Sequence, residues 1–93
     1  MRLTLITFEF YLPVSHSLKD KRRVIQGLKT RIRNRLNVSV AEVEYQESWQ
    51  RSVLAVAWVS SDGSSIDKTI SILDKLIVNQ DEVQVVKAVR SDY

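Results

Sequence analysis

Positive charge is concentrated in one segment of this 93-residue chain, where lysine and arginine recur at the spacing of a helix. Only one acid, Asp20, lies between Leu18 and Leu36, although the net charge of the whole chain is only +3. Ammonium and guanidinium groups hold phosphate through charge-assisted hydrogen bonds, which arginine can make in pairs. The sequence therefore points first to binding of a polyanion. The basic residues of the segment are Lys19, Lys21, Arg22, Arg23, Lys29, Arg31, Arg33 and Arg35.

The same segment has an apolar stripe at about 100° per residue, which predicts an amphipathic helix. The stripe consists of Val24, Ile25, Leu28, Ile32 and Leu36. On the opposite side lie five cations that we call the basic face: Lys19, Arg22, Arg23, Lys29 and Arg33. They predict contacts with the phosphates of a polyanion and an affinity that falls as salt rises. A solvated helix face and a dock for an acidic protein are the alternatives, but a solvated face normally mixes both signs of charge.

Two tryptophans and one arginine could add contacts to an RNA. Trp49 and Arg51 are predicted to be secondary nucleic-acid contacts, because aromatic rings stack on unpaired bases. The alternative for Trp49 is that it anchors its own loop. The alternative for Trp58 is a place in the core or in an oligomer interface. The basic-glycine-aromatic string of RNA-recognition motifs is absent from the sequence.

Groups suited to catalysis are sparse. His16 is the only histidine and is flanked by two serines, but sequence adjacency does not make a nucleophile and base pair. Glu42 and Glu44 share a face if the strand alternates regularly, and Glu47 follows, so these carboxylates could hold a metal or divide acid and base roles. Solvated carboxylates are far commoner. There is no glycine-rich phosphate loop and no zinc-site spacing, so we expect no enzyme, no cofactor, no metal and no small-molecule substrate.

Length and composition predict a single domain over residues 1–93. Hydrophobic residues make up 44% of the chain, and the longest apolar run, Val53–Val59, is too short to cross a membrane. Cysteine is absent, which excludes disulfides and thiolate metal sites. The first residues lack the pattern of a signal peptide, so we expect a cytoplasmic protein without a membrane role.

Hydrophobic periodicity predicts six elements in the order β-α-β-β-α-β. Ser17 is expected to cap the first helix and Asn37 to end it in a left-handed conformation. A shift of phase in the second strand predicts a bulge near Ala41. This order predicts a ferredoxin-like split βαβ α+β fold, with two helices on one face of a four-stranded antiparallel sheet and strands one and three in its centre. The elements are strands at 3–12, 38–45, 51–60 and 83–89 and helices at 18–36 and 66–77.

The helices of such a fold leave the other face of the sheet uncovered. One assignment turns the row from Val53 to Val59 toward the helices and leaves Leu54, Val56 and Trp58 outside. The opposite assignment also leaves an apolar outer face. In either case an apolar face predicts an interface, and we expect a homodimer or higher oligomer formed through it. For the last strand, alternation predicts that Val83, Val85 and Val89 share one face with Lys87.

Three blocks of the sequence resemble the YlxP-like family of small bacterial proteins over about residues 1–90. The blocks are Ser17–Val24, Asn37–Val43 and Gln46–Arg51, with Val59-Ser60 downstream, and the departures are Leu36 in place of an aromatic and Glu47 in place of Asp. The resemblance implies a ferredoxin-like fold and no established enzymatic activity. The family's genes often lie near those for translation initiation and ribosome maturation, which implies a link to RNA or ribosomes. The polar positions that the family marks, and that become candidates for contact, are Ser17, Lys19, Lys21, Arg22, Arg23, Asn37, Ser39, Glu42, Gln46, Gln50 and Arg51.

Overall fold

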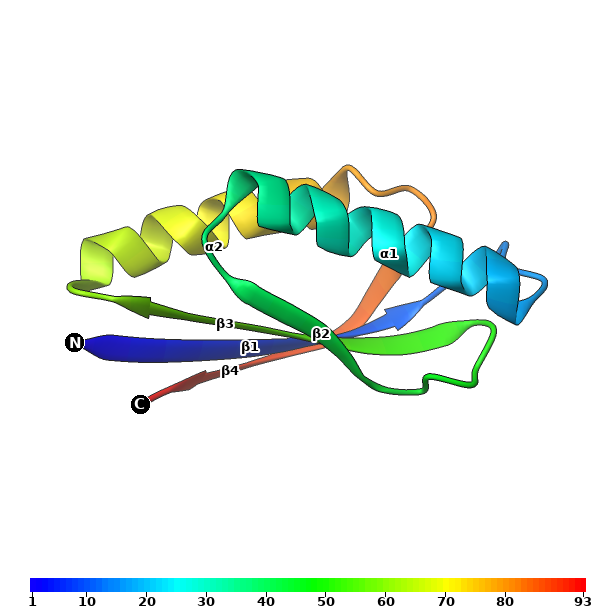
Figure 1. The fold of residues 1–93 in the computed structure, drawn as a ribbon, viewed down its shortest axis with the longest axis horizontal. Helices are drawn as coiled ribbons and strands as arrows, with labels where there is room; N and C mark the ends of the chain where they lie inside the picture. The colour runs from blue at the N-terminus through cyan, green and yellow to red at the C-terminus, as the bar shows by residue number, and fades with distance from the viewer.

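A computed structural model describes residues 1–93 and contains six elements in the expected order. The four strands form one antiparallel sheet in the order β2-β3-β1-β4, so strands one and three are central as predicted. Both helices cover one face of this sheet, and the two chain ends lie at the same end of the molecule (Figure 1). The ferredoxin-like fold is thereby confirmed. The bounds are β1 (Arg2–Tyr11), α1 (Leu18–Arg35), β2 (Ser39–Glu44), β3 (Arg51–Ser60), α2 (Gly63–Val78) and β4 (Gln84–Asp92).

The core lies between the helices and the inner face of the sheet. Alternate residues of β1, from Thr4 to Phe10, are buried there, and the rings of Phe8 and Phe10 stack with centroids 6.0 Å apart. The apolar stripe of α1 packs against them, and α2 adds Ile66, Leu73 and Ile77. Neither helix combines the length and hydropathy of a membrane-spanning segment.

The structure settles which face of β3 meets the helices. Trp58 lies opposite Thr4 in the register and is only 6% exposed, and Leu54 and Val56 are fully buried in the same core. Val59, on the other face, is 63% exposed. The first assignment considered above is therefore wrong. Bulky side chains fill the space between sheet and helices, and the alanines of β3 face outward on the surface that we call the outer face.

Two bulges change the side to which strand residues point. In β2 the register shifts between Glu42 and Glu44, so the predicted bulge is present but falls at Val43. Because an extra residue reverses the alternation, Glu42 lies on the helix side and Glu44 on the outer face, and their predicted shared face is wrong. In β4 a second shift places Val85 opposite Phe10 but Lys87 opposite Glu9. The expectation that Val85 and Lys87 share a face is wrong for the same reason.

Polar caps define where the helices begin. Ser17 caps α1 as predicted, because its Oγ accepts a hydrogen bond from the Asp20 N–H at 3.0 Å. The end of α1 differs from the prediction, since Leu36 is extended at φ −132° and Asn37 has no positive φ. The chain leaves the helix directly into the extended path toward β2. The only residue with positive φ is Tyr45, at 62°.

Asp62 caps α2 and gives the fold a local pH dependence. Its carboxylate accepts hydrogen bonds from the Ser65 N–H and the Ser64 hydroxyl, and these hold the pKa of Asp62 below its ordinary value of 3.8. The stabilisation is complete above the ordinary pKa and is lost as the pH falls through the lower folded pKa. In urea unfolding between about pH 5 and 2, Asp62→Asn should show a shallower loss of stability than the native chain, because Asn caps without titrating. An unchanged slope would contradict this assignment.

The placement of the tryptophans predicts two different fluorescence signals. Trp58 is 6% exposed and Trp49 is 57% exposed. The variant Trp49→Phe should therefore emit at shorter wavelength and resist quenching by iodide. The variant Trp58→Phe should emit at longer wavelength and be quenched readily. Equal quenching of the two variants would place Trp58 on the solvent side and refute the face assignment.

Candidate polyanion-binding face

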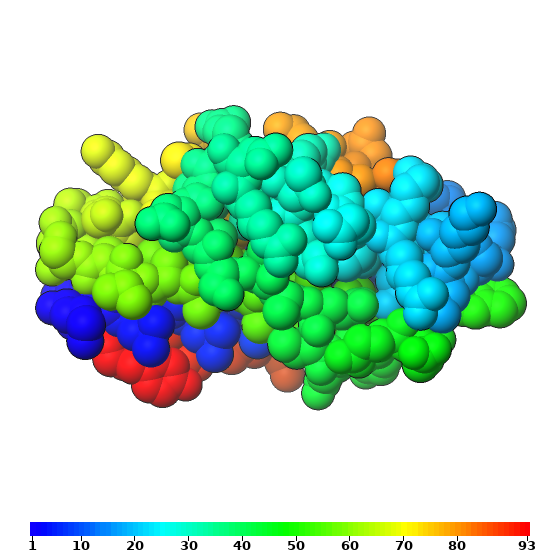
Figure 2. Space-filling model, viewed as in Figure 1, coloured from blue at the N-terminus to red at the C-terminus, as the bar shows by residue number.

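The basic face lies along one side of α1, and Figure 2 shows this helix running across the molecule above β2. Lys19, Arg22, Arg23 and Arg33 are exposed and Lys29 is half-buried. The face forms because the core-facing stripe of α1 must turn toward the sheet, which leaves these positions outside. The structure therefore brings together all five helix residues that the sequence singled out.

Two members of the basic face already have partners within the chain. Arg23 Nη2 lies 3.0 Å from Glu82 Oε2, in an exposed ion pair between α1 and the turn before β4. Arg33 Nη2 donates a hydrogen bond to the Val40 carbonyl at 2.8 Å. None of the four ion pairs of the chain involves Lys19, Arg22 or Lys29. These three side chains therefore have no ion-pair partner within the chain.

Three cations of the basic face, together with Gln26, form a straight ridge on the side of α1 nearest β2. Arg22, Gln26, Lys29 and Arg33 follow at intervals of four, three and four residues, so the ridge is about 16 Å long at 1.5 Å per residue. A shallow hollow of about 410 Å³ lies between this ridge and β2, with Glu42 in its wall. The charge of this carboxylate is offset by Lys21, so Arg22 and Lys29 are the unpaired charges beside the hollow.

Lys21 belongs to the same segment but points the other way. Its side chain is fully buried, and Nζ lies 2.6 Å from Glu42 Oε2 and donates to the carbonyls of Tyr45 and Gln46 at 2.8 and 3.4 Å. The Ser52 hydroxyl donates to the same carboxylate oxygen at 2.6 Å. Sequence reasoning counted Lys21 and Glu42 among candidates for contact. The sequence did contain an indication that Lys21 is buried. Lys21 lies four residues before Ile25 and seven before Leu28, so it falls within the apolar stripe of the helix.

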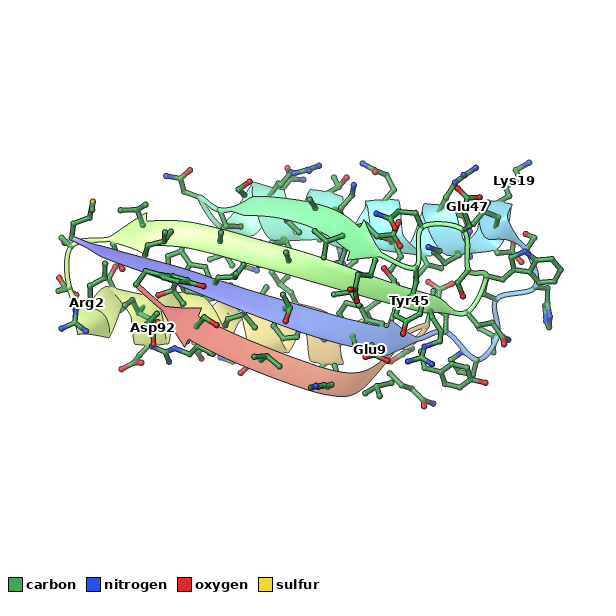
Figure 3. The ribbon with its side chains drawn as sticks, turned by 90° about the horizontal axis from the view of Figure 1, so that it is seen from below. Arg2, Glu9, Lys19, Tyr45, Glu47 and Asp92 are labelled. Atoms are coloured by element: carbon green, nitrogen blue, oxygen red, sulfur yellow. The ribbon has the colours of Figure 1, made fainter.

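The loop between β2 and β3 presents Trp49 at the end of the molecule where α1 begins. Lys21 binds the start of this loop, and Gln50 fixes its end by donating to the carbonyls of Pro13 and Ser15 at 3.4 and 3.2 Å. Figure 3 shows Glu47 of this loop and Lys19 at the same end of the molecule, with Arg2 and Asp92 at the other. Trp49 is thus held on an anchored loop with its side chain more than half exposed.

Arg51 does not join the basic face. It lies opposite Tyr11 on the outer face, forms an ion pair with Glu9 and sits over the ring of Tyr45 at 4.7 Å. Its guanidinium is therefore engaged on the side of the sheet away from α1. A contact between Arg51 and RNA stays a prediction without support from this arrangement.

The groups considered for catalysis are not assembled. The Ser15 hydroxyl donates to the Ser17 carbonyl and the Ser17 hydroxyl accepts from Asp20, so neither bonds to His16. The bulge separates Glu42 from Glu44 across the sheet. No group of three or more histidine and carboxylate side chains is placed to hold a metal ion.

Fold and surface together define a small ferredoxin-like α+β domain whose most distinctive surface is a cationic helix face. The chain belongs to the family described as "Protein of unknown function (DUF503)", which matches residues 3–90. It is 43% identical over 54 residues to the uncharacterized protein YlxP of Bacillus subtilis (strain 168). That alignment spans 58% of this chain and 59% of YlxP, so it covers little more than half of either protein.

Solved structures support the fold alone. A structural-genomics protein named YJCS superposes with a TM-score of 0.63 at 11% identity, covering 96% of each chain. The de novo designed protein Foldit4 superposes with a TM-score of 0.60 at 12% identity, covering 98% of this chain and 97% of that one. Because a designed sequence shares the architecture, the fold carries no functional assignment.

Removing Lys21 should destabilise the protein strongly. Lys21→Ala leaves the Glu42 carboxylate, which is only 16% exposed, without its charge partner, and this costs about 2–3 kcal/mol in the free energy of unfolding. The matched control Arg22→Ala removes an exposed cation next to it and should change stability by less than about 0.5 kcal/mol. The double variant Lys21→Met with Glu42→Gln should recover part of the loss, because no buried charge remains. Urea unfolding followed by circular dichroism tests this, and equal effects of Lys21→Ala and Arg22→Ala would refute it.

Proposed function

We propose that this chain is a non-catalytic RNA-binding module that holds phosphates on its basic face. The observation that carries the proposal is the unpaired charge of Lys19, Arg22 and Lys29 on one exposed side of α1. Lys21, the one cation of this segment that the fold buries, is neutralised, which shows that the chain supplies a carboxylate where a cation is structural. Where it leaves cations unpaired on one face, an external anion is the natural counterpart.

The ridge suits a chain of phosphates better than a single anion. Its length of about 16 Å spans several phosphates of one strand, and counterion release makes such contacts additive. Trp49, on the loop at the end of the molecule where α1 begins (Figure 1), is 57% exposed and offers a ring on which an unpaired base can stack. These features favour a single-stranded or looped segment of RNA.

We assign the target to ribosomal RNA and the protein to the cytoplasm. This part of the proposal rests on the family, whose genes often neighbour those of translation initiation and ribosome maturation. It does not rest on the geometry of the basic face. Binding to ribosomal subunits and to unrelated RNA, compared across a salt series, distinguishes a ribosomal target from general affinity for RNA.

Charge reversal on the ridge provides the direct test. Arg22→Glu with Lys29→Glu should weaken binding to ribosomal subunits at least about tenfold and reduce the slope of log K against log salt by about 2. Lys68→Glu with Lys75→Glu, on exposed positions of α2, makes the same change in net charge and is the matched control. It should alter affinity less than about twofold, because the effect depends on place rather than on total charge.

Two outcomes would overturn the proposal. Equal weakening by the ridge pair and the α2 pair would show that only net charge matters. Absence of RNA retention at low salt would show that the basic face serves another partner, of which an acidic protein is the leading alternative.

A further inference from the structure

The outer face of the sheet is divided into an uncharged part and a charged part. The register of the strands arranges its residues in rows across the sheet. The three rows nearest the start of β1 contain no charged side chain, although charged residues make up 27% of the protein. The next row contains Glu44, Val53, Glu9 and Lys87. The uncharged rows are Val59, Leu3 and Tyr93; Ser39, Ala57, Leu5 and Ser91; and Ala41, Ala55, Thr7 and Val89.

We propose that this outer face binds the same face of a second copy, with a two-fold axis parallel to the strands and lying between β1 and β3. Such an axis keeps each row against the corresponding row of the partner and exchanges the two halves of the sheet. The β1 and β4 half of one copy then lies on the β2 and β3 half of the other. Sheets stacked in this way stay within about 30° of each other, so the rows remain in register near the axis.

The side chains of the two halves are complementary in size. The β2 and β3 half carries Ala41, Ala55 and Ala57 at its centre, and the β1 and β4 half carries the larger Leu5 and Val89. The axis brings Leu5 onto Ala57 of the partner subunit and Val89 onto Ala41 of the partner subunit. Large side chains therefore meet small ones, which is how layers of side chains interlock.

The charges of the fourth row select the same axis. In row four, β4 carries Lys87 and β2 carries Glu44, so the exchange of halves brings each lysine over a glutamate of the other copy. An axis perpendicular to the strands would lay Glu9 and Glu44 on the apolar rows. That arrangement would bury the carboxylate of Glu44, which has no ion-pair partner within the chain, at high cost. The face is therefore self-complementary in charge for one orientation only.

The outer face is also large enough for a specific dimer. Ten-residue central strands and four strands about 4.8 Å apart give about 600 Å² in projection. Because side chains protrude from the sheet, the accessible area of the outer face is larger than this projection. It approaches the area of about 800 Å² that each partner buries in a stable interface. The interface needs nearly the whole outer face, so a single charge introduced there should weaken the dimer measurably.

Sedimentation between about 1 and 500 µM tests the dimer, which should be the main species at the upper end. Ala57→Asp and Val59→Asp each place a carboxylate in the uncharged rows and should raise the dimer Kd at least about a hundredfold. Val59 is 63% exposed, so its variant leaves the monomer fold intact. Ser71→Asp, on an exposed position of α2, is the matched control and should dimerise like the native chain.

A charge swap tests the axis. Glu44→Lys should raise the dimer Kd about tenfold, because it opposes Lys87 of the partner subunit. Adding Lys87→Glu restores opposite charges and should return the Kd to within about threefold of the native value. A monomer at the highest concentration, or a dimer indifferent to Val59→Asp, would overturn the interface. Failure of the double variant to recover would overturn the axis. RNA binding is measured separately, and its loss would leave this inference intact.

Discussion

The ion pair between Lys21 and Glu42 is the interaction on which the rest of the arrangement depends. A buried lysine is costly to desolvate, and here the cost is offset by a carboxylate and two backbone carbonyls. The pair joins α1 to β2, and the hydroxyl of Ser52 extends it to β3. Glu42 faces the helices in the regular register of β2, and the bulge at Val43 that follows turns Glu44 outward. The same lysine binds the start of the loop that presents Trp49, where Tyr45 takes a positive φ. One buried cation therefore joins the helix to the edge strand and to the start of the adjacent loop.

The buried ion pair also divides the cations of the basic segment into two kinds. Composition treats all eight cations alike, but the fold separates the one whose charge is neutralised inside from those whose charge is available outside. Lys21 is one residue away from Arg22, and a rotation of 100° sends one side chain into the core and the other to solvent. A polyanion would contact the second kind only. One cation of this helix therefore forms a buried ion pair, and others form an exposed surface. The number of charges in the segment does not distinguish these two roles.

Most of the fold could be predicted because its signals are local. Ser17 caps a helix through an atom three residues away, and the alternation of β1 and β3 is visible within ten residues. What failed depended on contacts distant in sequence. The face that holds Trp58 is fixed by pairing with Thr4, more than fifty positions earlier. The phase shift in the second strand indicated a bulge but not its position at Val43, and the bulge in β4 is visible only in the register of paired strands. Among the site residues, the helix members could be placed by periodicity alone. The separation of Arg51 could not, since it follows from Glu9 and Tyr45 on the far side of the sheet.

The basic face of α1 and the uncharged part of the outer face lie on opposite sides of a single sheet. One surface is cationic and the other is uncharged, so they suit different partners. The helix layer carries exposed, unpaired cations, whereas the outer face has eleven positions without charge next to one row of mixed sign. A face without charge gains little from a polyanion, and a ridge of like charges repels its own copy. Pairing through the sheet would therefore leave both helix layers outside, with one basic face on each side of the assembly. If the proposed RNA binding and the proposed pairing both hold, two copies would bind two separate segments of RNA, because the sheets and both helix layers lie between their ridges.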